Sequence, residues 1–287
     1  ETLLTIPTDR SGDIWSMPSD GSDRPRRISR GLLDGAYGFS VAPDDRIVFQ
    51  TLEAGQLDLA IMNADGSGKT LLTEDPDEDR YPSTTADGRV VWVSRGAGGI
   101  RLFEMALDDR KRRPLLDDPL TEFARPAVAA EVGVVFEHLS GGIPSLWRLV
   151  PGSSRPTQLT DYRSQFPAIS HDGTRLAFVY FDEQVGLRIG ITGIEGGPPI
   201  LSIDQPVSTG SGSFVRWTWD DEALLINTVE HDRTNLWRLP LDGGEPIQWT
   251  DFDEKRLLWA DYSSDGRVLF FSRGQISRDA VLIENFR

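Results

Sequence analysis

The sequence predicts an all-β fold, a β-propeller built from four-stranded antiparallel blades, and three observations lead to this prediction. Turn-forming dipeptides recur along the chain at steps of 43, 44, 41, 48 and 45 residues. A second series of turns with a similar period falls between them. The segments between the turns are short, β-branched and aromatic, and none is typical of a long amphipathic helix. A repeat of about 44 residues that carries four strands is typical of a propeller blade.

The two series of turns define four strands, A to D, in each repeat. Strand A precedes the first turn, strand B follows it, strand C precedes the second turn and strand D closes the unit. Asp-Gly is a strong hairpin signal because glycine accepts the positive φ that such turns require. The first series is Asp44-Asp45, Asp87-Gly88, Glu131-Val132, Asp172-Gly173, Asp220-Asp221 and Asp265-Gly266, and the second is Asp20-Gly21, Asp65-Gly66, Asp108-Asp109, Gly152-Ser153, Glu195-Gly196 and Asp242-Gly243. Strand C carries an aromatic residue in four repeats, and Ala60 and Gly190 break this pattern.

The number of blades stays open between seven and six. The chain contains seven B–C pairs but six A strands and six D strands, so the direct count is seven blades in one domain of residues 1–287. Residues 1–29 and 257–287 are then incomplete terminal blades. The alternative is six blades, closed by strands from both ends. We expect the chain to be part of a longer protein, in which a strand upstream of Glu1 completes the first unit.

Composition excludes several classes of function. With 45 acidic and 30 basic residues, the chain has a net charge of −15 and a pI near 4.6, which disfavours contact with nucleic acid. No apolar run approaches the roughly 18 residues that cross a bilayer, so we expect no membrane insertion by this domain. The chain has no cysteine. Disulfides, thiolate nucleophiles and cysteine-ligated metals are therefore excluded, and an oxidising compartment suits the chain.

The motifs that suggest catalysis or metal binding are weak. The stretch Gly66-Ser67-Gly68-Lys69-Thr70 resembles part of a phosphate-binding loop, but Asn63 stands where the first glycine is needed, so we predict an ordinary turn. The three histidines show no paired metal-ligand spacing; we expect His171 to be exposed in a turn and His138 and His231 to lie near B–C loops. Residues 75–79 are acidic without the calcium-binding loop pattern. We predict no catalytic residue, no metal ligand and no cofactor, with calcium left open.

Acidic residues concentrate in the loops between strand D and the next strand A. These loops and the B–C loops share one face of a propeller, so we expect that face to attract cationic groups. The alternative is that a protein of this charge carries acids wherever there is no strand. The acids of the D–A loops are Asp34, Glu74, Asp75, Asp77, Glu78, Asp79, Asp117, Asp118, Glu122, Asp161, Asp204, Asp251, Asp253 and Glu254, against Arg30, Arg80, Arg163, Lys255 and Arg256.

One repeat position gives the candidate binding site. It lies six residues before the first turn, where strand A begins beside the central channel. The residues at this position are Gly38, Tyr81, Arg125, Phe166, Phe214 and Trp259. Aromatic residues beside a cation are good peptide anchors, and we take Tyr81, Arg125, Phe166, Phe214 and Trp259 as candidate ligand-binding residues at the channel mouth. Ordinary packing between blades is the other interpretation.

These repeats resemble the TolB-like propeller repeat over almost the whole chain. The matching motifs are Ala42-Pro43-Asp44, Ser170-His171-Asp172-Gly173, Leu236-Trp237-Arg238, Met62-Asn63-Ala64-Asp65-Gly66 and Leu159-Thr160. Residues 277–287, 181–184 and 215–218 are also similar to propellers that follow a serine/threonine kinase or winged-helix domain in bacterial regulators. That resemblance implies the sensor or interaction half of a signalling protein, lying across a membrane from its effector.

We therefore expect a noncatalytic sensor or protein-interaction propeller. It binds a protein or peptide, including a cationic one, on the face of its D–A and B–C loops, outside the cytoplasm and tethered through an upstream segment. Two alternatives come from other classes of protein. One is an enzyme or part of one: a propeller that gates a serine peptidase or another hydrolase, or one with carboxylates such as Asp117, Asp118 or Asp251 at the channel. The other is a structural unit packed on an upstream propeller.

Overall fold

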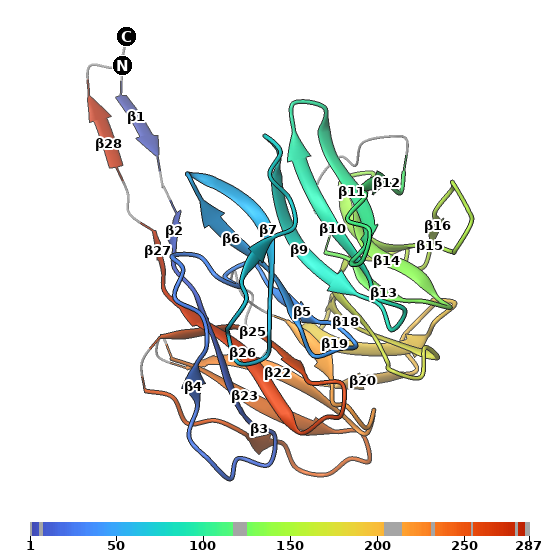
Figure 1. The fold of residues 1–287 in the computed structure, drawn as a ribbon. Helices are drawn as coiled ribbons and strands as arrows, with labels where there is room; N and C mark the ends of the chain where they lie inside the picture. Colours follow the sequence, from blue (N-terminus) through green and yellow to red (C-terminus); the bar gives the residue numbers. More distant parts are fainter. Residues whose placement is uncertain are drawn as a thin grey trace.

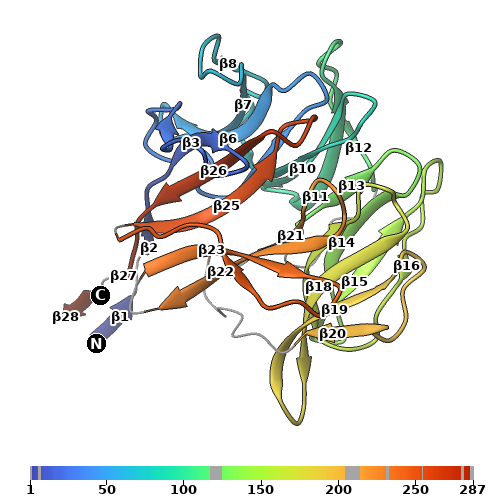
Figure 2. The same cartoon turned by 90° about the horizontal axis from the view of Figure 1, so that it is seen from below.

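The computed structural model describes residues 2–5, 8–116, 125–203, 214–230, 233–253, 255–278 and 281–284. Within these ranges the chain forms six four-stranded antiparallel sheets and two short two-stranded ribbons. The sheets are arranged around a central channel as the blades of a propeller (Figure 1, and Figure 2 from below). In this part of the chain there is no helix of the length and apolarity needed to cross a membrane.

The first three blades follow the chain in order, each running from strand A at the channel to strand D at the periphery. Blade 1 consists of β5 (Phe39–Val41), β6 (Ile47–Glu53), β7 (Gln56–Met62) and β8 (Thr70–Leu71). Blade 2 consists of β9 (Glu78–Thr84), β10 (Arg89–Gly96), β11 (Gly99–Ala106) and β12 (Arg113–Pro114). Blade 3 consists of β13 (Ala127–Ala129), β14 (Gly133–Ser140), β15 (Ile143–Leu149) and β16 (Thr157–Gln158).

The last three blades include the one that closes the ring. Blade 4 consists of β17 (Ser164–Ile169), β18 (Arg175–Asp182), β19 (Gly186–Gly193) and β20 (Leu201–Ile203). Blade 5 consists of β21 (Val215–Trp217), β22 (Ala223–Glu230), β23 (Arg233–Pro240) and β24 (Ile247–Gln248). Blade 6 takes β25 (Arg256–Tyr262) and β26 (Val268–Gly274) from one end of the chain and β3 (Asp13–Pro18) and β4 (Arg26–Arg27) from the other.

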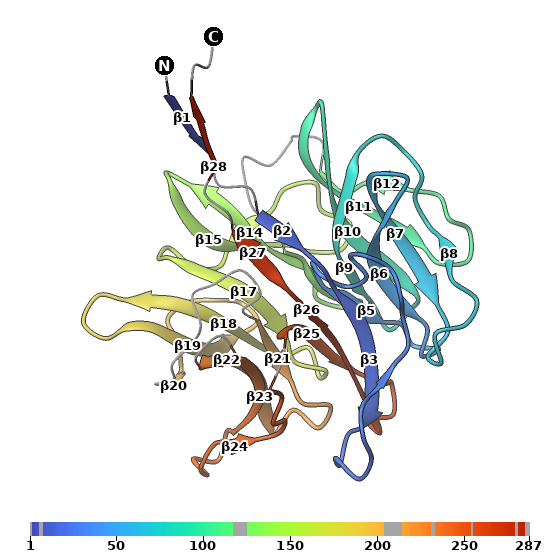
Figure 3. The ribbon, with the colours of Figure 1, turned by 90° about the vertical axis from the view of Figure 1, so that its left-hand side faces the viewer.

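The expectation of seven blades is wrong, and the six-blade alternative is confirmed. β3 pairs with β26, with Trp15 opposite Phe271, so the two terminal segments complete one blade instead of forming two incomplete ones. The extra strand pair counted from the sequence is a ribbon outside the ring. In it β2 (Thr8–Arg10) pairs with β27 (Ile276–Arg278), and β1 (Thr2–Thr5) pairs with β28 (Val281–Glu284). Figure 3 shows this ribbon leaving the propeller where blade 6 would otherwise have its B–C loop.

Neighbouring blades pack through alternating side chains of their strands. In β10, Val90 and Trp92 face blade 1 and belong to one hydrophobic cluster with its Leu59. Val91 and Val93 of the same strand face blade 3. Successive side chains of a strand point to opposite faces of a sheet, so a run of apolar residues is what a blade with neighbours on both sides requires.

The two small residues that break the aromatic pattern of strand C lie opposite large residues of strand B. Ala60 pairs with Phe49, and Gly190 pairs with Phe178. A Cβ atom at Gly190 would lie 3.0 Å from the Phe178 ring. These two blades therefore place the aromatic ring on strand B instead of strand C, and Gly190 leaves the space that it needs.

The Leu-Thr motif of strand D has a structural role at the outer part of the blades. The Thr73 hydroxyl accepts a hydrogen bond of 2.9 Å from the Leu59 amide of the adjacent strand C. Thr160 does the same for Leu146, also at 2.9 Å. Each threonine satisfies a buried backbone N–H beside a D strand of only two residues.

Asp221 occupies a turn position that is glycine in three of the six first-series turns, and it joins two blades. Its backbone has a φ of 55°, a conformation that usually favours glycine. Its carboxylate accepts hydrogen bonds of 3.0 Å from the backbone N–H groups of His171 and Asp172 in the corresponding turn of blade 4. Asp45 likewise accepts a hydrogen bond of 2.8 Å from the Ser264 amide of blade 6. The aspartates that stand in place of glycine at these two turns therefore link neighbouring blades.

Candidate functional site

The five predicted site residues converge on one constriction of the central channel. Together with Arg216 and three prolines they line a space of about 10 Å³, which is roughly the volume that one water requires. The sixth repeat position is Gly38, whose φ is 101° and whose missing Cβ would lie 3.1 Å from the Trp259 ring. The sequence period thus identified side chains that line one space in the channel, and their role in binding stays a prediction. The lining residues are Tyr81, Pro82, Arg125, Pro126, Phe166, Pro167, Phe214, Arg216 and Trp259.

Two of the five residues act in packing. Phe214 is 1% exposed and Trp259 is 8% exposed, and their ring centroids lie 5.8 Å apart. The Trp259 indole N–H donates a hydrogen bond of 2.7 Å to the backbone carbonyl of Phe39 in blade 1. For this pair, contact between blades accounts for the aromatic side chains.

Arg125 lies between the other two aromatic residues. Its guanidinium is 4.5 Å from the centroid of the Phe166 ring and 5.4 Å from that of Tyr81. It pairs at 3.2 Å with Glu137, a carboxylate with no exposed surface. Glu137 also accepts a hydrogen bond of 2.8 Å from the Phe166 backbone N–H. This buried pair fixes the position of the arginine and of the aromatic residue beside it.

The side of the constriction nearer the D–A loops carries a series of arginine and tyrosine side chains, which we call the channel mouth: Arg10, Tyr37, Arg80 and Tyr81. The Tyr37 ring lies between two guanidinium groups, 4.5 Å from Arg10 and 4.6 Å from Arg80. Tyr37 also meets Tyr81 edge to face at a centroid distance of 6.1 Å. Burial lowers the pKa of Arg10, and the neighbouring Arg125 and Arg80 charges lower it further while the two tyrosines raise it. Three arginines therefore lie near each other at this mouth.

Tyr81 and Phe166 have an unusual backbone. Their φ angles are 55° and 58°, in the left-handed region that bulky side chains rarely adopt. Each precedes a proline, which further disfavours helical conformations. Both lie where the A strand changes register against strand B. Such strained residues persist only where their surroundings hold them, and they concentrate at functional sites.

Several acids of the D–A loops are paired or buried, which weakens the expected negative field. Asp75 and Asp77 pair with Arg112, and Glu78 pairs with Arg80. Asp34 is buried, accepts hydrogen bonds of 2.7 Å from the Thr51 hydroxyl and from the backbone N–H of residue 31, and lies 3.5 Å from the Lys69 ammonium. Asp251 is exposed. Five of the predicted acids, Asp117, Asp118, Glu122, Asp204 and Glu254, lie outside the described residues.

Asp79 is a buried carboxyl group next to the channel mouth. It has no exposed surface, and neither of its oxygens has a hydrogen-bond partner among the described residues. Burial raises its pKa to about 6, although nearby Ser94, Thr73 and Trp92 groups favour the ionised form. The folded state therefore holds a proton on Asp79 at pH values where the unfolded chain has released it.

We expect Asp79→Asn to stabilise the protein at neutral pH by up to about 3 kcal/mol, because it removes a buried charge. The raised pKa makes wild-type Asp79 destabilising above about pH 6, and this cost fades as the pH falls towards the unfolded value. Urea unfolding at about pH 7.5 and about pH 4.5 measures the effect, with exposed Asp109→Asn as the control. If the free energies of unfolding of Asp79→Asn and wild type differed by the same amount at both pH values, this account would be contradicted.

The remaining motifs behave as turns or packed residues. Residues 66–69 lie in the turn between β7 and β8, as predicted, and Thr70 begins β8. The Lys69 ammonium pairs with Glu53 at 2.8 Å. His171 is exposed in its turn, also as predicted, with Nδ1 2.9 Å from Asp221. His138 lies in β14 with its ring against Trp147, and burial lowers its pKa. Among the described residues no group of three or more metal-ligating side chains is present. His231 lies outside them.

Comparison with known proteins supports the fold. The chain matches no family model. Tol-Pal system protein TolB from Anaeromyxobacter dehalogenans is 36% identical over 85 residues, which is 29% of this chain and 19% of that protein. The crystal structure of TolB from Acinetobacter baumannii superposes with a TM-score of 0.65 at 14% identity, over 93% of this chain and 65% of that one. The fold is TolB-like.

The TolB-like fold is shared by enzymes. Oligogalacturonate lyase from Vibrio parahaemolyticus has a TM-score of 0.58 at 11% identity, over 87% of this chain and 80% of that one. Aldose sugar dehydrogenase from Streptomyces coelicolor has a TM-score of 0.56 at 13% identity, over 92% of this chain and 99% of that one. At these identities the likeness concerns the fold alone, so the function has to be argued from the site.

Sequence reasoning missed four residues of the channel and its mouth: Arg10, Tyr37, Arg216 and Arg80, the last of which was considered as a loop cation alone. Arg10 and Tyr37 lie outside the repeat position that was aligned, and Arg10 belongs to the ribbon that was taken for a blade strand. Arg216 follows the aligned residue Phe214 by two positions, so its side chain lines the same channel one step further along strand A. Arg216 could have been found from the sequence, because residues two apart in a strand point to the same side.

Proposed function

We propose that this chain is a noncatalytic interaction propeller that binds a protein or peptide at the channel mouth, on the face of its D–A and B–C loops. The observation that carries the proposal is the alternation of arginine and aromatic side chains from Arg10 to Phe166. Guanidinium groups stacked on aromatic rings present a firm surface with free N–H donors, and such residues dominate the energetics of protein interfaces. The strained backbone of Tyr81 and Phe166 supports a role beyond packing.

The charge of the channel mouth favours particular groups of a partner. Arg10, Arg80 and Arg125 lie close together there, with Glu78 paired to Arg80, while Glu74, Asp161, Asp251 and Asp253 of the D–A loops are exposed. We therefore propose that the channel mouth receives an acidic or carbonyl-rich segment, and that any cationic group of the partner meets the exposed acids of the D–A loops. This proposal differs from the expectation that the whole face of the D–A and B–C loops attracts cationic groups.

A gating role for a peptidase has less support. Gating needs a path through the channel, whereas the constriction leaves a space of only about 10 Å³ at the level of Phe166 and Trp259. The curated relative is named as a component of the Tol-Pal system, which favours an interaction role over catalysis. We further propose that the chain acts outside the cytoplasm as the sensor part of a bacterial signalling protein, tethered through an upstream segment.

Selection of displayed peptides on the immobilised propeller tests the proposed face. We expect selected peptides to bind wild type and to lose affinity roughly tenfold or more in Tyr37→Ala and in Tyr81→Ala. The matched control is Trp219→Ala, because Trp219 is 55% exposed in an A–B turn on the opposite face. Peptides whose binding depends on Trp219 and not on the two tyrosines would overturn the proposal, and so would a selection that yields no binder.

A further inference from the structure

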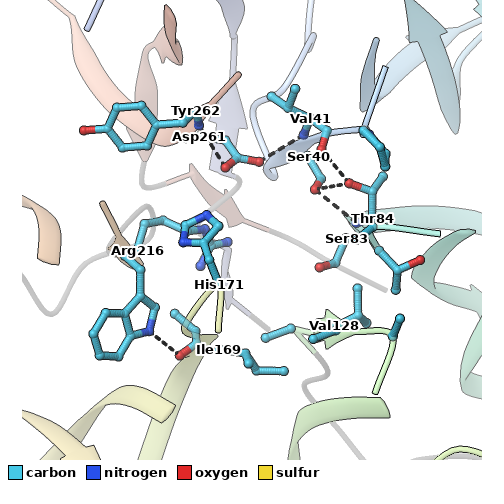
Figure 4. A pocket seen from close by; sticks show the side chains of 18 of the residues that line it. Ser40, Val41, Ser83, Thr84, Val128, Ile169, His171, Arg216, Asp261 and Tyr262 are labelled. Atoms are coloured by element: carbon cyan, nitrogen blue, oxygen red, sulfur yellow. Dashed lines mark hydrogen bonds between the residues drawn. The ribbon is translucent and has the colours of Figure 1, made fainter. Parts of the chain in front are cut away.

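The channel opens on the far side of the constriction into a cavity of about 510 Å³. The cavity is lined by the later halves of the A strands and by the A–B turns, so it faces away from the channel mouth. Figure 4 shows it from close by, with Ser40 and Ser83 on one side and Arg216 and His171 on the other. Its volume suits a small molecule or the end of a peptide.

The floor of the cavity holds a guanidinium group with few partners. Arg216 lines both the constriction and the cavity, and its guanidinium lies 4.0 Å from the centroid of the Trp259 ring. Nη1 donates a hydrogen bond of 2.8 Å to the backbone carbonyl of Val215. Among the described residues, no carboxylate oxygen lies within 4.0 Å of a guanidinium nitrogen of Arg216. Burial lowers the pKa of Arg216 to about 10, which reflects the cost of a poorly compensated charge.

The nearest carboxylate is occupied elsewhere. Asp261 accepts a hydrogen bond of 3.0 Å from the Val41 amide of the neighbouring blade and one of 2.9 Å from the Tyr262 amide. Burial raises the pKa of the Asp261 carboxyl, while the Val41 amide and the Arg216 charge act to lower it. Arginine carries five N–H donors in a planar fork that matches a carboxylate. In the part of the chain that the structure describes, Val215 is the one hydrogen-bond acceptor of the Arg216 guanidinium, so its other donors can bind an anion in the cavity.

The walls limit the kind of anion. Val128 and Ile169 are apolar, and the hydroxyls of Ser40 and Thr84 bond to each other at 2.8 Å. Asp172 is among the residues at the cavity rim and would repel a ligand of high negative charge. A single negative charge on an apolar body fits these surroundings better than a phosphate. We propose that the cavity binds a carboxylate attached to an apolar body, with Arg216 as its anchor.

Titration with sodium hexanoate, followed by tryptophan fluorescence and calorimetry, tests the proposal. We expect saturable binding that hexanamide does not reproduce and that Arg216→Gln weakens roughly tenfold or more. Arg175→Gln is the matched control: Arg175 also stacks on a tryptophan ring, at 4.5 Å from Trp217, but does not line the cavity. Equal binding of hexanamide, unchanged binding in Arg216→Gln or no saturable binding would overturn the proposal.

A second variant and a second probe complete the design. Ser83→Phe places a phenyl ring in the cavity while keeping Arg216, so it should weaken hexanoate binding even if Arg216→Gln does not fold. Unchanged binding in Ser83→Phe would count against the cavity. A short apolar peptide with a free C-terminus, compared with the same peptide amidated, separates two sources of the carboxylate. If the peptide with a free C-terminus binds more tightly than hexanoate, the carboxylate that the cavity recognises is that of a peptide C-terminus. If hexanoate binds more tightly, it is that of a small organic acid.

Discussion

Phe178→Ala is expected to lower the free energy of unfolding by about 3–5 kcal/mol, the usual range for a large aromatic side chain removed from a packed core. Phe178 has no exposed surface and packs in the seam between blades 3 and 4. Its partner across the sheet is Gly190, which has no side chain that could move into the vacated space. Urea unfolding followed by tryptophan fluorescence measures the loss.

Two further variants make the Phe178 prediction specific. Phe181→Ala, in the same strand but 45% exposed, should change stability by no more than about 0.5–1 kcal/mol. Gly190→Ala should destabilise wild type, because its Cβ would lie 3.0 Å from the Phe178 ring and 3.1 Å from the Tyr180 ring, and it should cost less in the Phe178→Ala background, where the first contact is removed. Additive effects in this cycle would show that the two residues do not share one space.

Arg125→Met is expected to cost about 3–5 kcal/mol of stability, because it leaves the buried Glu137 carboxylate without its ion-pair partner. The double variant Arg125→Met/Glu137→Gln should recover most of that loss, since a neutral amide can still accept the Phe166 N–H. The surface pair of Arg46 and Asp44 supplies the control: Arg46→Met should cost less than about 1 kcal/mol.

The Arg125 variants also separate stability from binding. If the single and the double variant were equally destabilised, the Glu137 charge would not be the cause of the loss. Arg125 therefore serves poorly as the first variant in a binding assay. Tyr37 and Tyr81, which are half-buried at the channel mouth, are better choices.

The turn series predicted the blades well because each turn carries its own local signal. The Ser170 hydroxyl, for example, donates a hydrogen bond of 2.6 Å to Asp172 within its own turn. This local contact is available from the sequence, whereas the bonds that Asp221 adds from the next blade are not. The count of blades failed because a strand pairs with whatever edge is available. Residues 2–5 have the composition of a blade strand, but they pair with β28 in the ribbon. No local sequence pattern shows whether such a segment pairs within a blade or within a ribbon.

For the candidate site, too, the positions of the residues could be predicted from the repeat, but the charge of the site could not. The repeat period placed Tyr81, Arg125, Phe166, Phe214 and Trp259 at equivalent positions, and such positions meet at the channel in a closed ring. The charge of the site could not be obtained this way, because it depends on pairing. Arg112 neutralises acids of a loop more than thirty residues earlier, and Arg10 reaches the channel mouth from a different part of the chain.

Closure of blade 6 has a consequence for synthesis of the protein on the ribosome. β3 emerges among the first strands, yet its partner β26 is made about 250 residues later, which at roughly 5–20 residues per second is a delay on the order of 10–50 seconds. During that interval Ile14, Trp15 and Met17 have no sheet to join, and an unpaired apolar strand is prone to wrong pairing. The nascent chain therefore needs β3 kept apart, by a chaperone or by the blades made after it, until β26 is available.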